Sequence, residues 1–207
     1  MTPPPEPPPP GPPGPAPAQG PAMEVLVFAE AEVPAGLAGQ VAALEGEAWP
    51  GATPGHDPAL APRALLLVAA DGTVAASLAL LFKEVRHAGR TYRAAGLSAV
   101  VTRKALRGRG HGALLVAAAR RELAAVPGLD LVLFSCDRPL APFYEAAGFT
   151  RLPGAVLVGG TPADPLATDE PGFDKEVLAE FLAPDAGAAA FEGTRIALYP
   201  GPVDRLW

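Results

Sequence analysis

The sequence has one cysteine, few basic residues and no long apolar run, and each of these deficits excludes a class of protein. Cys136 alone cannot form an internal disulfide or a cysteine-based structural metal site, and it fits a reducing cytoplasm. No apolar run approaches the roughly 20 residues of a membrane span, and the N-terminus does not resemble a signal peptide. The 16 Lys and Arg residues are outnumbered by 22 Asp and Glu, which argues against nucleic acid as a partner. We therefore expect a cytoplasmic protein that binds neither membrane nor nucleic acid.

Proline and glycine are abundant instead, with 27 and 23 residues, and many of the prolines lie at the N-terminus. Residues 1–22 are almost entirely Pro, Gly and Ala, a composition that cannot form a packed core. We expect a disordered Pro-rich tail there, either inert or a ligand for a PxxP-binding partner. The rest of the chain, 23–207, has the length of one compact domain.

The first half of this domain predicts a strand, a helix and an antiparallel meander. Asp71-Gly72 joins two apolar runs and is the strongest short hairpin signal, and a second turn is expected at 87–90. A polar loop at 51–62 follows the helix, and long loops inside compact domains often line sites. The expected elements are strands at 23–29, 64–70, 73–85 and 91–102, and a helix at 35–49.

The second half alternates helices and strands. A continuous apolar strand of the buried kind is expected at 129–135. Around it we expect helices at 113–125, 141–147 and 175–182, and strands at 155–160 and 194–198. The order of elements predicts a mixed-sheet α/β sandwich, with a splayed central strand pair as an option that the sequence does not decide. Residues from about 159 to 207 would form a C-terminal extension on the substrate side.

A glycine-rich segment, RGRGHG, separates the last strand of the meander from the next helix. Its glycines, Gly108, Gly110 and Gly112, stand where backbone N–H groups and a helix N-terminus can hold a phosphate. The segment lacks the G-x-G-x-x-G pattern of dinucleotide-binding loops and the Gly-Lys-Ser/Thr of Walker loops. A purely structural glycine-rich turn stays open as an alternative.

RGRGHG fits the R/Q-x-x-G-x-G/A signature of GCN5-related N-acetyltransferases, and SCDRPLAPFYEAAGF resembles the segment that follows their fifth strand. The resemblance covers about residues 97–150. It implies a mixed, mainly antiparallel central sheet flanked by helices, with acetyl-CoA as co-substrate and no metal. By the same resemblance the residues that would bind the coenzyme are Val100, Val101, Thr102, Arg107, Gly108, Arg109, Gly110, His111 and Gly112.

The resemblance also implies the catalytic groups. Tyr144 would protonate the departing thiolate, although a purely packing aromatic is the alternative. Ser98 stands where some relatives carry a Glu base, so it would at most hold a water in a relay. Cys136 could be an acetylated nucleophile or a buried small residue, and the second is favoured because only Arg138 offers a basic neighbour. The histidines His56 and His87 are isolated in the sequence, His111 belongs to the loop, and none has metal-ligand spacing.

Within the superfamily, the pattern is most similar to aminoglycoside 2′-N-acetyltransferases, which would make the protein an antibiotic-resistance enzyme. That resemblance gives Ser135, Trp207 and a carboxylate near Asp57 or Asp204 the task of holding a cationic acceptor. Two alternatives stay open: acetylation of another amine, and a catalytically idle module that binds coenzyme A. The sequence also leaves open whether the chain is a monomer or a homodimer.

Overall fold

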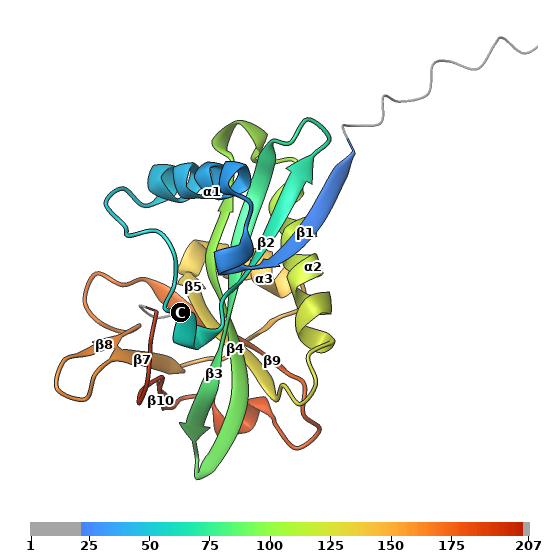
Figure 1. The fold of residues 1–207 in the computed structure, drawn as a ribbon. Helices are drawn as coiled ribbons and strands as arrows, with labels where there is room; N and C mark the ends of the chain where they lie inside the picture. Colours follow the sequence, from blue (N-terminus) through green and yellow to red (C-terminus); the bar gives the residue numbers. More distant parts are fainter. Residues whose placement is uncertain (1–21, 205–207) are drawn as a thin grey trace, which may run out of the picture.

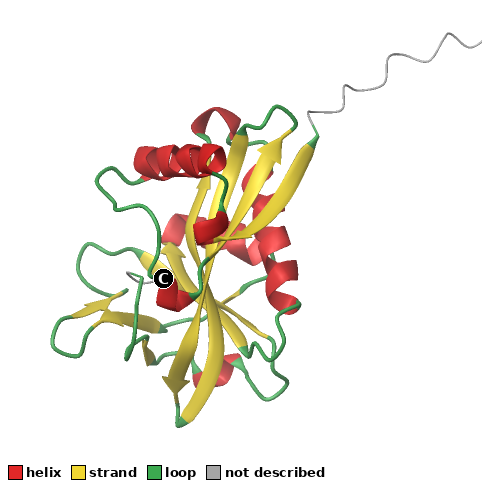
Figure 2. Cartoon of the chain, viewed as in Figure 1, coloured by secondary structure: helices red, strands yellow, loops and turns green. Residues whose placement is uncertain are grey.

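The computed structural model describes residues 22–204, so Trp207 and all but the last residue of the expected N-terminal tail lie outside the described residues. The described chain builds a seven-stranded sheet in the order β1-β2-β3-β4-β5-β9-β6 (Figures 1 and 2). Only β4 and β5 run parallel; the other neighbours are antiparallel. The expected mixed, mainly antiparallel sheet is therefore confirmed. Its strands are β1 (Met23–Ala29), β2 (Arg63–Ala69), β3 (Val74–His87), β4 (Arg90–Thr102), β5 (Leu131–Asp137), β9 (Lys175–Phe181) and β6 (Thr150–Arg151).

The meander forms as expected because its turns have the required chemistry. Gly72 has a φ of 82°, which only glycine adopts without strain, and the β2–β3 hairpin closes there. Ala88 and Gly89 both have positive φ, at 47° and 77°, the combination that a two-residue primed turn needs. The long β3–β4 hairpin has this turn at its tip, at the lower end of the molecule in Figure 1.

Helices cover both faces of the sheet. The helix α1 (Ala35–Ala48) packs on one face, where Leu44 meets Leu66 of β2 and Val101 of β4. The helix α2 (His111–Ala124) packs on the other, with Leu115 and Leu123 fully buried in the larger core. The short helix α3 (Ala141–Ala146) follows β5. Among residues 22–204 no helix is both long enough and apolar enough to span a membrane.

The segment at 175–182 is a strand, so the helix predicted there is wrong. Lys, Glu, Leu and Ala favour helices as isolated residues, but β9 lies between β5 and β6 and bonds to both through its backbone. Val177, Leu178 and Ala179 are buried in that position. Burial in the sheet therefore overrides the local preference.

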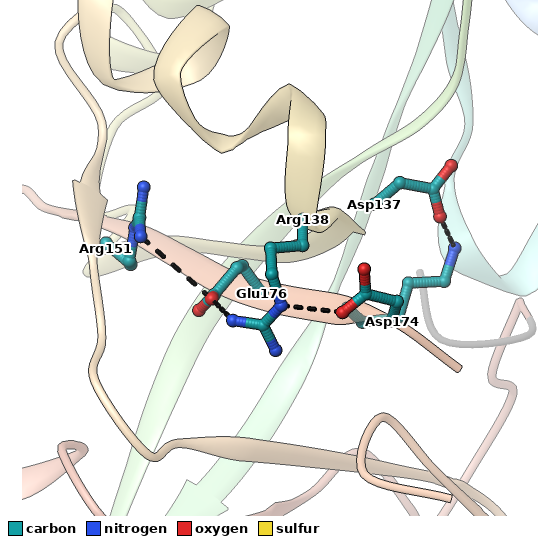
Figure 3. Close-up of polar contacts among 6 residues, drawn as sticks. Asp137, Arg138, Arg151, Asp174 and Glu176 are labelled. Atoms are coloured by element: carbon teal, nitrogen blue, oxygen red, sulfur yellow. Dashed lines mark hydrogen bonds and ion pairs between the residues drawn. The ribbon is translucent and has the colours of Figure 1, made fainter. Parts of the chain in front are cut away.

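An ion-pair network fixes the start of β9 against the end of β5, and Figure 3 shows its members. The Arg138 guanidinium lies between two carboxylates: its Nε is 2.6 Å from Asp174 Oδ1, and Nη1 contacts Glu176. Lys175 Nζ lies 2.7 Å from Asp137 Oδ1. The contacts join the end of β5, the turn after it and β9, so the carboxyl end of β5 has a fixed position although most of these groups are exposed.

The last described segment of the chain contacts β3. A small sheet of β10 (Arg195–Ala197), β7 (Val156–Gly160) and β8 (Pro165–Ala167) packs beside the main one. After it, Lys83 Nζ of β3 donates to the carbonyl oxygens of Leu198 and Pro202, the latter at 2.8 Å. These bonds bring the described end of the chain back to the sheet and position Asp204.

Candidate active site

The strands β4 and β5 diverge in the middle of the sheet. They pair only at Ala94–Leu131 and Ala95–Val132, although β4 continues to Thr102. A bulge accompanies the divergence, because two residues, Ala99 and Val100, oppose Leu78 alone on β3, and Ala99 has a φ of 49°. The splayed strand pair is therefore present, and beyond Ala95 the backbone of β4 no longer pairs with β5.

The glycine-rich loop lies at the end of β4 and begins α2. Gly108 and Gly110 have φ values of 74° and 81°, and Gly110 is the N-cap of the helix, with no side chain capping its first N–H groups. A Cβ on Gly112 would lie 3.1 Å from Thr102 Oγ1 and 3.5 Å from the Phe143 ring. The loop thus approaches β4 closely and leaves backbone N–H groups available to an anion.

This arrangement fits coenzyme A. The N-terminus of α2, with Arg107 and Arg109 beside it, suits the pyrophosphate, and the free edge of β4 at 100–102 suits the amide-containing pantetheine arm. Arg107 itself donates from Nε to the Thr102 carbonyl at 3.1 Å, which holds the loop against the strand. The geometry is thus compatible with the predicted coenzyme residues, whose contacts with coenzyme A stay a prediction.

Tyr144 lies on α3 and packs among aromatic rings. Its ring centroid is 5.0 Å from Phe134 and 6.4 Å from Phe149, in edge-to-face arrangements, and the residue is buried. Burial raises the pKa of its phenol well above the usual value, so the hydroxyl keeps its proton at neutral pH. Tyr144 therefore combines tight packing with the protonation state that an acid needs, and its catalytic role stays a prediction.

Cys136 is buried on β5. Burial raises the pKa of its thiol to about 11, so little thiolate forms near neutral pH. This environment makes Cys136 a poor nucleophile.

His56 is the residue that the sequence analysis misjudged. It is not isolated: Nδ1 lies 2.6 Å from Glu30 Oε2, and Nε2 lies 3.1 Å from Ser98 Oγ. Ser98 Oγ in turn donates to Asp204 Oδ2 at 2.8 Å, and that carboxylate is 3.4 Å from His56 Nε2. The His56 side chain is only 6% exposed. Four residues from distant parts of the sequence thus form one chain of polar contacts, which reaches β4 at Ser98, next to the bulge, and continues to Asp204.

The local backbone explains how His56 reaches Glu30. Gly55 has a φ of 84°, and a Cβ there would lie 3.1 Å from Glu30 Oε1. With no side chain at Gly55, the backbone N–H of His56 donates to that same oxygen at 3.0 Å. The Glu30 carboxylate therefore bonds to the backbone and to the ring of His56, and it fixes the ring orientation.

The charges in this cluster are coupled. Burial alone would lower the pKa of His56, but the hydrogen bond to Glu30 and the charges of Glu30, Asp204 and Glu45 outweigh it and raise the pKa above 6.5. Burial would raise the pKa of Glu30, yet the contact with His56 lowers it. The carboxylates around His56 therefore favour its protonated form, so the ring holds a proton more firmly than a free histidine does.

The predicted acceptor residues are only partly brought together. Asp204 meets Ser98, whereas Asp57 is exposed and its carboxylate accepts from Ala59 N–H at 2.8 Å, which caps a short turn. Ser135 lies on β5 opposite Val177, beyond the last pair with β4. Trp207 is outside the described residues. Among residues 22–204, no three His, Cys, Asp or Glu side chains are grouped as metal ligands.

Comparisons with known proteins agree with this fold. A family described as Acetyltransferase (GNAT) family matches residues 40–149, and no curated protein matches the chain. Escherichia coli ElaA superposes with a TM-score of 0.57 at 16% identity, covering 77% of this chain and 99% of its own. E. coli YhbS, a GNAT family N-acetyltransferase solved in complex with CoA, gives 0.55 at 20% identity, with coverages of 87% and 93%. An acyl-CoA N-acyltransferase from Pseudomonas aeruginosa superposes with a TM-score of 0.55 at 18% identity, covering 77% of this chain and 99% of its own.

The match at 40–149 spans more than half of the chain and includes the larger part of α1, the strands β2 to β4, the glycine-rich loop and α3. It therefore contains both segments that carried the resemblance. The chain belongs to the acetyltransferase (GNAT) family.

Proposed function

We propose that the protein transfers an acetyl group from acetyl-CoA to the amine of a small cationic acceptor, with His56 as the general base. The observation that carries the proposal is the chain of contacts from Glu30 through His56 to Ser98, which ends on β4 where that strand leaves β5. Acetyl-CoA is the donor that the family uses, and the glycine-rich loop at the end of β4 supports it.

The orientation of His56 favours proton removal at Nε2. A carboxylate can only accept hydrogen bonds, so the contact with Glu30 places a proton on Nδ1. In the neutral ring, Nε2 then carries the lone pair, and it faces Ser98 on the active-site strand. Ser98 has one hydroxyl proton, which it donates to Asp204 in this structure. When that hydroxyl turns to Nε2 of the neutral ring, it can pass its proton to His56 and take one from the acceptor.

The bond changes can be assigned to these groups. The amine nitrogen forms a bond to the thioester carbonyl carbon, and the carbon–sulfur bond breaks. The proton that the nitrogen loses passes by way of Ser98 to His56 Nε2, 3.1 Å from that hydroxyl. The departing thiolate takes the proton that the buried phenol of Tyr144 retains at neutral pH.

The charge of the cluster supports a cationic acceptor. The negative charges of Glu30, Asp204 and Glu45 all act on His56, so the acceptor side of β4 has a negative potential. Such a field attracts an ammonium group before it is deprotonated. Aminoglycosides, the acceptors suggested by the sequence pattern, are polyamines and belong in the first panel of candidates, together with monoamines.

The test is release of thiol from acetyl-CoA, measured with each amine of the panel and without amine. The proposal expects release that depends on an amine, with the acetylated amine identified by mass spectrometry. His56→Gln should lose most of the amine-dependent rate while its affinity for acetyl-CoA, measured by calorimetry, is unchanged. Tight binding of acetyl-CoA without amine-dependent release would instead describe an idle coenzyme-binding module and would refute the proposal.

A further inference from the structure

A pocket of about 280 Å³ lies between α1 and the face of the sheet that α1 covers. Its floor includes Ala64 and Leu66 of β2 and Ser77 and Ala79 of β3, which are neighbours in the register of the two strands. Small side chains of α1, among them Ala42, form the opposite wall. Figure 1 shows α1 lying over this part of the sheet. The walls are therefore mostly apolar.

The polar groups of the pocket are unevenly placed. Glu30, Glu45 and His56 line it together, and their charges interact, so they form one charged end. His56 also contacts Ser98, which connects this end to the active-site strand. A ligand in the pocket would therefore have its charged group at the histidine and the rest of its body against the apolar walls.

Ser77 is a second polar feature of the pocket. It is 1% exposed, and its hydroxyl has no hydrogen-bond partner among the described residues. It shares a face of β3 with Ala79 and stands opposite Leu66, so it belongs to the pocket floor. Buried hydroxyls are normally hydrogen-bonded, and one left without a partner in a pocket wall indicates a ligand that supplies the partner.

We propose that this pocket binds the acceptor, and that the acceptor is an amine with a compact apolar body and one further hydrogen-bonding group for Ser77. This inference rests on the proposed function, because it specifies the substrate class of the same site. The amine lies at the Glu30, Glu45 and His56 end. Burial raises the pKa of Glu45, and an ammonium group beside it would offset that cost.

The apolar walls select against a sugar acceptor. A polyhydroxylated ring would bury several hydroxyls against Ala and Leu side chains, where they lose their hydrogen bonds to water without replacement. An aromatic or branched aliphatic amine has no such penalty. The pocket thus points to a monoamine with an apolar body, and away from an aminoglycoside.

The experiment compares three probes, 2-phenylethylamine, tyramine and kanamycin, in the full chain with CoA present. Ala42→Leu fills the pocket from α1, and Ala43→Leu makes the same change at the neighbouring exposed position of the same helix. We expect the two aromatic amines to bind at least about tenfold more tightly than kanamycin. Ala42→Leu should weaken them by a similar factor, whereas Ala43→Leu should leave them unchanged, with equal affinity for CoA in all variants.

Ser77→Ala provides a second, milder test. The variant removes a hydroxyl that has no partner, so its melting temperature should not fall. It should weaken the binding of tyramine, which carries a hydroxyl, about fivefold, and leave that of 2-phenylethylamine unchanged.

Binding by calorimetry separates the inference from the proposed function. Aromatic amines that bind equally well to wild type and Ala42→Leu would overturn the pocket assignment, and so would tighter binding of kanamycin. If the amines bind and Ala42→Leu weakens that binding, but no thiol is released, only the proposed chemistry would be overturned. Acetylation of kanamycin alone would sustain the chemistry and refute the pocket.

Discussion

Glu30 bonds to His56 twice, through the backbone N–H at 3.0 Å and through ring Nδ1 at 2.6 Å, although 26 residues separate the two. This double contact fixes the ring and turns Nε2 toward Ser98. Histidines that transfer protons are often oriented by a carboxylate in this way. The predictions below follow from it and from the groups around it.

Replacing His56 should remove the base without disturbing the coenzyme loop. His56→Gln keeps a polar side chain of similar size, and we expect kcat to fall by roughly 10²-fold or more because general-base catalysis contributes that much. Steady-state thiol release measures the effect, with calorimetry of acetyl-CoA as the control. A kcat within about twofold of wild type would exclude His56 as the base.

The pH dependence of kcat/KM should show the titration of His56. His56 must be neutral to accept a proton, and the Glu30 hydrogen bond and nearby carboxylates raise its pKa above 6.5 despite its burial. The rate constant kcat/KM should therefore rise with pH through a midpoint above 6.5. Glu30→Gln removes the main stabilising charge and should move that midpoint to lower pH. An unchanged midpoint in the Gln variant would assign the titration to another group.

Tyr144→Phe should separate acid catalysis from packing. The substitution keeps the ring that packs against Phe134 and Phe149, so the melting temperature should change little. Loss of the phenol should lower kcat by roughly 10²-fold, with the KM for acetyl-CoA little altered. If kcat stays at the wild-type value, Tyr144 acts only through its packing.

The glycine-rich loop can be tested with a matched pair of variants at Gly110. This residue has a φ of 81°, so any side chain there costs some backbone strain. Gly110→Asp and Gly110→Asn share that strain and differ only in charge. We expect Asp to weaken acetyl-CoA binding at least tenfold more than Asn, because a carboxylate would repel the pyrophosphate. Equal affinities of the two variants would show that the anion binds elsewhere.

The local elements were predictable because their signals are local. The Asp71-Gly72 turn, the glycines of the loop and the apolar strand of β5 each depend on neighbouring residues, and all three formed as expected. The strand β9 was missed because its conformation depends on β5 and β6, which lie far away in the sequence. A helix-favouring composition cannot reveal such partners.

The residues of the candidate site also fall into those that a local motif identifies and those that only the fold brings together. Tyr144 and the phosphate loop could be identified from motifs, whereas His56 carries no motif, and its partners come from β4, from the turn after β1 and from the C-terminal segment. The one available signal was its place in the long loop at 51–62, which was expected to line a site. The role of Trp207 lies outside the described residues and stays a prediction.

The central claim, that His56 is the base of an amine acetyltransferase, is tested most directly by amine-dependent thiol release in wild type and His56→Gln over a range of pH. The account predicts acetylated amine from the wild type, an acid limb with a midpoint above 6.5, and the loss of both the rate and that limb in the variant. A wild-type protein that binds acetyl-CoA yet acetylates no amine, or a variant that keeps the rate and the acid limb, would contradict it.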